Sequence, residues 1–197
     1  MMFVFDMLGT VAFAIAGALV GVRKKFDIFG ISVLALSTAV GGGIVRDVVI
    51  SNTPPMAFRN PIYVTVSVIS AAIVMLVHKQ AHKYNMTIQI CDALGLGAFT
   101  VAGANMAVTF GYNNFLTVTF LAVVTAAGGG VLRDILARDV PGIFRKEIYA
   151  VAALAGAVCF YFIYPYVDED TSMYVCFTVT TVLRLVAMKY DWQLPIV

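Results

Sequence analysis

Seven long apolar stretches constrain the fold of this chain more than any other feature of its sequence. Charged residues, prolines and asparagines separate them, and they cover about 3–22, 29–50, 60–78, 90–110, 115–137, 147–165 and 172–189. Each is close to the roughly 20 apolar residues that an α-helix needs to cross a bilayer. Because lipid offers no hydrogen-bond partners to the backbone, helices are the elements that such stretches form. We therefore expect an all-α integral membrane protein with seven transmembrane helices.

The composition supports this expectation. Of the 197 residues, 61% are hydrophobic and 12% are charged, whereas about 25% of the residues of a soluble domain are charged. The net charge of +2 is too small to indicate nucleic acid as a partner. The expected surrounding is the lipid bilayer of the cell (inner) membrane, which the chain crosses several times.

The first half of the sequence recurs in the second half. The segment "DMLGTVAFAIAGA" at 6–18 aligns with "DALGLGAFTVAGA" at 92–104, and "GGGIVRD" at 41–47 aligns with "GGGVLRD" at 128–134. Further matches link Pro54, Phe58, Arg59 and "IY" at 62–63 with Pro141, Phe144, Arg145 and "IY" at 148–149. Internal repetition of this kind indicates two copies of one structural unit.

Each copy contains three of the seven stretches. We expect a first three-helix repeat over 1–84, a second over 85–168, and a seventh helix with a short C-terminal tail over 169–197. Since three is an odd number, the second copy enters the membrane from the opposite side. The expected arrangement is therefore two inverted-topology repeats of three helices plus a seventh helix.

Basic residues gather in the connections on one side of the membrane. That side holds Arg23, Lys24, Lys25, Lys79, Lys83, Arg138, Arg145, Lys146 and Lys189. The other side holds Arg59 and the acidic "DED" at 168–170. Because short connections rich in Lys and Arg stay in the cytoplasm, we expect a cytoplasmic C-terminus and an N-terminus outside.

Three consecutive glycines stand inside the second stretch and again inside the fifth: Gly41, Gly42 and Gly43, then Gly128, Gly129 and Gly130. Each weakens a helix by about 1 kcal/mol relative to alanine. One interpretation is close helix packing through small residues. The other is a kinked or broken helix beside a wet cavity, where freed backbone groups bind a small ion or zwitterion. Since paired interruptions in inverted repeats point to a pathway, we expect kinks in the second and fifth helices.

An arginine follows each triplet, and inside a membrane its charge needs a partner or water. We expect Arg46 in the outer half of the bilayer and Arg133 in the inner half. Snorkelling to the lipid headgroups is the alternative for both side chains. The adjacent Asp47 and Asp134 are also candidate pathway residues, but they are expected to be poor partners of the arginines, because neighbouring residues face different directions on a helix.

Better partners are Asp6 and Asp92, which open the first and fourth stretches on the matching sides. We predict that Asp6 pairs with Arg46 and Asp92 with Arg133, at the two mouths of one pathway. Helix N-capping is the alternative role of both aspartates. Other candidates to line the pathway are the polar residues inside the stretches, namely Ser37, Thr38, Thr100, Asn105 and Thr125.

The sequence contains no catalytic arrangement and no metal site. His78 and His82 are four residues apart, but they lie in a basic connection without carboxylates nearby, so solvated interfacial side chains are expected. The three cysteines lack metal-ligand spacing and are Cys91, Cys159 and Cys176. We expect neither an enzyme nor a cofactor.

The doubled pattern resembles a known family. "GGGIVRD" and "GGGVLRD", each after an "AF…AGA" stretch and before a proline and an "FR…IY" pattern, are similar to the bacterial and archaeal relatives of the trimeric intracellular cation (TRIC) channels. This group is also catalogued as the glycine-transporter domain family. The resemblance covers about residues 5–165 in two copies. It implies seven helices in a 3+3+1 arrangement, kinks at both triplets, and a homotrimer with one pathway in each protomer.

The resemblance also implies the function. In channel members the pathway carries monovalent cations, chiefly potassium, and the positions matching Arg46 and Arg133 lie near it. The alternative is a transporter of glycine or a similar small zwitterion, whose carboxylate and ammonium groups the paired Arg and Asp side chains would hold. In a third class, a membrane enzyme or structural subunit without a pathway, paired helix interruptions would have no purpose. Because two buried arginines are unusual in a cation pathway, we expect that carboxylates neutralise them or that they act as a gate.

Overall fold

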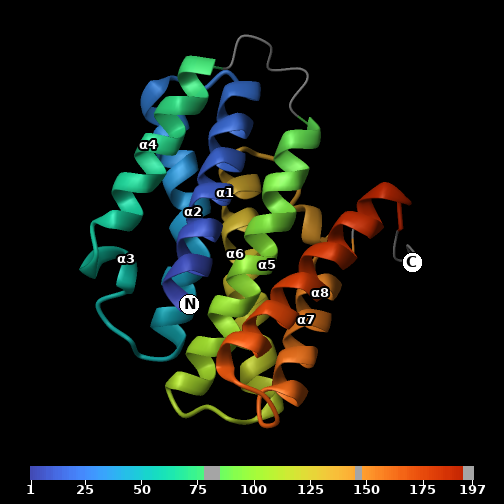
Figure 1. Ribbon diagram of the computed structural model, residues 1–197. Coiled ribbons are helices and arrows are strands. Elements are labelled where there is room, and N and C mark those ends of the chain that lie inside the picture. Colours follow the sequence, from blue (N-terminus) through green and yellow to red (C-terminus); the bar gives the residue numbers. More distant parts are fainter. Residues whose placement is uncertain (78–84, 145–147, 193–197) are drawn as a thin grey trace.

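The structure, a computed structural model, describes residues 1–77, 85–144 and 148–192. In these residues the regular elements are helices: α1 (Met2–Arg23), α2 (Ile28–Val49), α3 (Met56–Arg59), α4 (Ile62–Val77), α5 (Asn85–Thr109), α6 (Phe115–Leu136), the 3₁₀ helix η2 (Gly142–Phe144), α7 (Ala150–Ile163) and α8 (Glu169–Lys189) (Figure 1). Some side chains considered above lie outside the described residues, namely His78, Lys79, His82, Lys83, Arg145 and Lys146.

Each of the seven apolar stretches overlaps one of the longer helices over most of its length. Five of them are long and apolar enough to cross a membrane, namely α1, α2, α5, α6 and α8. In contrast, α4 has 16 residues and α7 has 14. At 1.5 Å per residue these two extend about 24 and 21 Å, less than the roughly 30 Å of bilayer hydrocarbon. The all-helical membrane fold is confirmed, whereas seven complete crossings stay a prediction.

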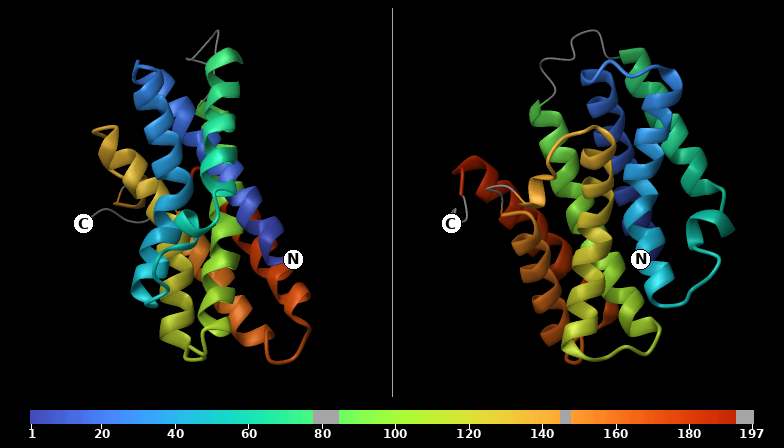
Figure 2. Two further views of the ribbon diagram at one scale, coloured as in Figure 1. Left: turned by 90° about the vertical axis from the view of Figure 1, so that its left-hand side faces the viewer. Right: turned by 180° about the vertical axis from the view of Figure 1, so that it is seen from behind.

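Equivalent helices of the two halves run in opposite directions. In Figure 1, α1 runs upward and α5 downward, whereas α2 runs downward and α6 upward, and Figure 2 shows the same directions from two other sides. The helices α2 and α6 also begin alike. Asp27 and Asn114 each accept a hydrogen bond from the amide three residues later, at 2.7 and 2.8 Å, which is the usual N-cap geometry. These directions agree with an inverted repeat, and the boundaries at 84 and 168 stay a prediction.

The centre of the molecule is the contact between α1 and α5, which lie side by side. Two matching contacts join them, because the Phe99 ring lies over Gly9 and the Phe13 ring lies over Gly95. The two buried rings meet edge to face with their centroids 5.1 Å apart. Glycine allows such close approach in membrane helices because it has no side chain. An aromatic pair therefore fills the middle of the helix bundle.

Both glycine triplets lie inside helices that are unbroken from end to end. At the triplets, α2 and α6 cross very closely. A Cβ atom on Gly42 would overlap the carbonyl oxygen of Thr125, and a Cβ atom on Gly129 would overlap that of Thr38. The triplets thus serve the close packing that was the alternative interpretation. The kinks in α2 and α6 stay a prediction.

Ion pairs tie two basic connections together at one end of the molecule. Lys24 Nζ lies 2.6 Å from Asp139 Oδ1, and Arg23 Nη2 lies 3.9 Å from Asp139 Oδ2. Arg23 also donates to Asn85 at the start of α5, at 3.2 Å. The connections after α1 and after α6 therefore share one end of the molecule. Which side of the membrane this end faces stays a prediction.

Candidate functional site

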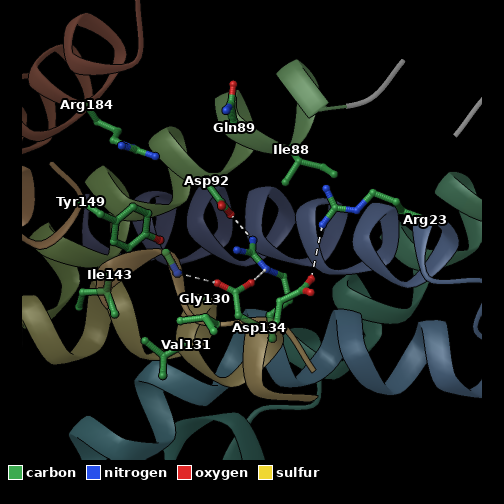
Figure 3. A pocket seen from close by; sticks show the side chains of 14 residues that line it. Arg23, Ile88, Gln89, Asp92, Gly130, Val131, Asp134, Ile143, Tyr149 and Arg184 are labelled. Carbon is green, nitrogen blue, oxygen red and sulfur yellow. Dashed lines mark hydrogen bonds and ion pairs between the residues drawn. The ribbon is translucent and has the colours of Figure 1, made fainter. Parts of the chain in front are cut away.

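Arg133 of α6 lies in a buried charged cluster between α5 and α6. Its Nη1 atom donates to Asp92 Oδ1 at 2.5 Å, and its Nε atom donates to Asp134 Oδ1 at 2.9 Å. Only 7% of Arg133 is exposed. Figure 3 shows the two carboxylates approaching from α5 and α6. The predicted Asp92–Arg133 pair is thus present, and two carboxylates supply the partners that a buried charge needs.

Arg46 of α2 is equally buried, but it has a different partner. Its Nε and Nη2 atoms both lie 2.9 Å from Asp47 Oδ1, and 4% of Arg46 is exposed. Among the described residues there is no direct ion pair between Arg46 and Asp6. Asp6 instead accepts a hydrogen bond from Tyr63 Oη at 3.2 Å. In place of the predicted pair, this half of the molecule therefore has a Tyr63–Asp6 bond and an Arg46–Asp47 pair.

The expectation that Asp47 and Asp134 are poor partners is wrong. Neighbouring residues do face different directions on a helix, but an arginine side chain is long enough to fold back to the next carboxylate. Each aspartate also uses its second oxygen beyond the helix end. Asp47 accepts from the Met56 amide at 2.8 Å, and Asp134 accepts from the Gly142 amide at 3.2 Å. The two aspartates therefore connect each arginine to the segment that follows its helix.

The alternative roles of the charged residues are not seen. Asp6 lies inside α1 and Asp92 inside α5, each several residues after its helix begins, so neither caps a helix. Arg46 and Arg133 are buried, so they do not snorkel to a headgroup. All four side chains belong to the interior of the molecule.

Each cluster lines a cavity, and the two cavities differ in size. The Arg133 cluster lines a cavity of about 280 Å³, which Tyr149 and Arg184 also line (Figure 3). The Arg46 cluster lines a cavity of about 30 Å³, together with Asp6. The smaller volume is enough for about one water molecule. The cavity at the Arg133 cluster therefore has more room for a ligand than the cavity at the Arg46 cluster.

The central aromatic pair lies close to the lining of both cavities. Phe99 lines the smaller one. Phe13 lies against Gly129, which precedes Gly130, a residue that lines the larger one. Of these two cavities, the packed aromatic pair thus borders the smaller one and approaches the lining of the larger one.

Most of the predicted polar lining residues bond within the helix bundle. The Thr38, Thr100 and Thr125 hydroxyls donate to carbonyl oxygens four residues earlier, at 2.6 to 2.7 Å, a common arrangement of threonine in helices. Asn105 donates to a glutamate at the start of α8, at 3.2 Å, and Ser37 is half-buried. None of these five side chains lines either cavity described above. Their role in a pathway stays a prediction.

Sequence reasoning missed Tyr63, Tyr149 and Arg184. The tyrosines belong to the "IY" pairs, which the repeat alignment treats only as markers, although a polar residue that recurs in both repeats is itself a signal. Arg184 is a charge inside the apolar stretch at 172–189, away from the ends of that stretch, and such charges are rare and functional inside membranes. Its guanidinium carbon lies 5.2 Å from the centroid of the Tyr149 ring.

Comparison with known proteins matches the chain twice to one family. The family model described as "Glycine transporter" matches residues 3–79 and again residues 89–165. The UPF0126 membrane protein of Deinococcus radiodurans is 34% identical over 97% of this chain and 89% of its own length. The UPF0126 inner membrane protein YadS of Escherichia coli is 33% identical over 96% of this chain and 93% of its own length.

Solved structures show the same likeness. One, from work on conductance through TRIC cation channels, is 36% identical and has a TM-score of 0.90 over 98% of this chain and 96% of its own. Another is the TRIC trimeric intracellular cation channel orthologue from Rhodobacter sphaeroides. It is 32% identical, with a TM-score of 0.91 over 96% of this chain and 98% of its own. The chain therefore belongs to the TRIC family of membrane proteins, which the glycine-transporter model describes.

Proposed function

We propose that this chain forms a TRIC-type channel of the cell membrane, with a pathway for potassium and other monovalent cations in each protomer. The solved relatives that share its fold over nearly the whole chain are cation channels. One observation carries the proposal. Buried arginines stand at equivalent positions of the two opposed halves, each neutralised by carboxylate and each beside a cavity. Such costly intramembrane charges mark ion pathways.

The carboxylates make the arginines compatible with cations. A lone guanidinium would repel a cation that comes close, and the repulsion is stronger in the low dielectric of the membrane interior. At Arg133 the charges of Asp92 and Asp134 offset this repulsion. Their oxygens also offer the kind of ligand that replaces part of the water shell of a potassium ion. The charged residues that line this cavity are three arginines and three aspartates, so a cation does not meet a bare positive charge there.

The proposed pathway is closed at its centre by the Phe13–Phe99 pair. A dry aromatic constriction excludes ions because they cannot pass without water. Opening would require the central helices to shift. The triplets at 41–43 and 128–130 have no side chains at the α2–α6 crossing, so we expect the predicted kinks to form there when the helices move.

Assembly and orientation are part of the proposal. A solved relative is described as trimeric, and we propose a homotrimer with a cytoplasmic C-terminus. The helices carry large exposed apolar side chains such as Phe29, Leu76 and Leu116, which suit lipid or neighbouring protomers. Native mass spectrometry from lipid-like detergent should detect three copies of the chain. A monomer under conditions that support ion conduction would contradict this part.

Glycine transport is not favoured as the alternative. A zwitterion would need a guanidinium that is open to its carboxylate, as in bidentate recognition. Here Arg46 and Arg133 already bind the carboxylates of their own chain. The solved relatives are also described as cation channels.

Current through a planar bilayer tests the proposed function. Purified protein in a potassium gradient should give single-channel currents that reverse near the potassium equilibrium potential. A protein heated until it unfolds is the matched control. Electrically silent and saturable glycine uptake by proteoliposomes would favour the transporter, and the absence of both activities would favour a subunit without a pathway.

A further inference from the structure

The two halves of the molecule differ at one pair of equivalent tyrosines. Tyr63 Oη donates to Asp6 Oδ2 at 3.2 Å. Tyr149 occupies the matching place in the second half, and its hydroxyl is buried without a hydrogen-bond partner in the described part of the chain. An unsatisfied buried polar group costs about 1–3 kcal/mol. Some other contact must therefore keep Tyr149 away from the aspartate that its equivalent binds.

The aspartates differ in the complementary way. Asp92 bonds to Arg133, whereas Asp6 bonds to Tyr63. Each aspartate thus has a tyrosine and an arginine as possible partners, and each half uses a different one. If Tyr149 bonded to Asp92 as Tyr63 bonds to Asp6, it would compete with Arg133 for that carboxylate.

Tyr149 contacts Arg184 of α8, and the described residues of the first half contain no counterpart of this contact. Its guanidinium carbon lies 5.2 Å from the Tyr149 ring centroid, which is cation–π geometry. Arg184 is 4% exposed, and it lines the same 280 Å³ cavity as Tyr149 and Asp92 (Figure 3). The family match ends at residue 165, so α8 lies outside both repeats. Among the described residues, no helix equivalent to α8 presents an arginine to Tyr63.

The other side of Tyr149 faces the glycine triplet. A Cβ atom on Gly130 would lie 3.1 Å from Tyr149 Oη, so the bare backbone there provides the space that the hydroxyl occupies. The tyrosine is therefore held between the guanidinium of α8 and the third glycine of α6.

We propose that Arg184 is a positioning residue of the pathway. By stacking on Tyr149 it holds the tyrosine hydroxyl over Gly130 and away from Asp92, so that Asp92 stays bonded to Arg133. Helix α8 thereby keeps Arg133 neutralised by two carboxylates beside the larger cavity. The consequence for conduction rests on the proposed function, but the contact itself does not.

The structure of the Arg184→Met variant tests the contact directly. We expect the Tyr149 hydroxyl to move within hydrogen-bond distance of Asp92, close to the 3.2 Å that separates Tyr63 Oη from Asp6 Oδ2. Arg184→Gln is the second variant if the first does not fold, because it keeps a planar polar group but loses the charge and length. If Tyr149 stays over Gly130 in the folded variant, its position comes from the backbone before α7 and the proposal is wrong.

Conduction tests the consequence through a double-mutant cycle. The R184M substitution has two expected effects. Removal of the positive charge raises cation conductance, whether or not Tyr149 has its hydroxyl. Release of Tyr149 lowers conductance, but only when the hydroxyl is present to bond to Asp92. The conductance ratio of R184M to wild type should therefore be lower than the ratio of R184M/Y149F to Y149F, by at least about twofold. Equal ratios would mean that Arg184 acts through charge alone. If no variant conducts, the proposed function fails, and the structure of the variant still decides the role of Arg184.

Discussion

At the scale of single residues, the buried arginine of each half forms an ion pair with the aspartate that follows it in the chain. The Arg46–Asp47 and Arg133–Asp134 contacts have the same 2.9 Å distance from Nε to Oδ1. Neighbouring partners cost little chain entropy, because the helix already holds their backbones together. The halves differ in what is added. Within the described residues, Arg133 takes a second carboxylate, from Asp92, whereas Arg46 takes none.

This difference predicts unequal effects of two matched substitutions. Asp92→Asn removes one partner of a buried charge, a change that costs about 3–5 kcal/mol when no other partner remains. Since Arg133 keeps Asp134, we expect a smaller loss of stability, about 2–3 kcal/mol. Asp6→Asn keeps a carbonyl oxygen for the Tyr63 hydroxyl and removes no direct ion pair, so we expect a loss below about 1 kcal/mol.

Thermal unfolding in detergent measures both effects, with wild type and the two variants prepared in parallel. A drop in melting temperature for Asp92→Asn that exceeds the drop for Asp6→Asn supports the partner assignment. Equal drops would mean that Asp6 and Arg46 attract each other as strongly as Asp92 and Arg133 do.

At the scale of elements, the glycine triplets show that one motif contains positions with different constraints. Gly42 has no room for a Cβ atom, because the backbone of α6 occupies that place. Gly43 is different, since the nearest atom to its Cβ position is Arg46 Nη2 at 3.8 Å, an ordinary contact. Both residues lie in the same helix one position apart. Alanine substitutions at these two positions can therefore distinguish the effect of helix packing from the effect of helix flexibility.

We predict that Gly42→Ala destabilises the protein and that Gly43→Ala does not. Forcing α2 and α6 apart loses close packing, and overpacking of this kind costs about 1–3 kcal/mol. Alanine at position 43 instead improves helix propensity by about 1 kcal/mol. Denaturant or thermal unfolding of the two variants measures the difference. If Gly43→Ala also abolished conduction without loss of stability, bending at the triplet would be needed for function in addition to packing.

Apolar length and repetition were sufficient to predict the helices and their opposed directions, because both are local or alignable properties of the chain. The role of Gly42 was less predictable, since glycine occurs both at close helix contacts and at helix kinks. Only the neighbouring helix, which the sequence does not reveal, distinguishes the two roles. The Arg46–Asp47 pair was missed because helix periodicity describes Cβ directions and ignores the reach of a long side chain. Tyr149 and Arg184 meet through tertiary contact between segments that no repeat relates. The site was thus predictable where the symmetry holds and unpredictable where α8 breaks it.

At the scale of the whole molecule, the inverted repeat gives two similar ends that differ in charge. One end holds the ion-paired connections of Arg23 and Lys24 with Asp139. At the opposite end, the connection between α5 and α6 is "FGYNN" at 110–114, which has no charged residue. A basic end stays in the cytoplasm during insertion. The charge difference therefore predicts a direction for a fold whose halves are otherwise alike.

Thiol labelling of intact cells tests this direction with one cysteine at each end. Lys25 and Asn113 are both exposed, and the native cysteines are replaced by serine or alanine so that only the new thiol reacts. A membrane-impermeant reagent should label N113C in intact cells and label K25C only after the membrane is opened. The opened cells control for expression, because both variants react there. Labelling of K25C alone in intact cells would reverse the orientation. Labelling of both would mean that the near symmetry of the halves lets the chain insert in either direction, with the basic connections too weak a signal to decide.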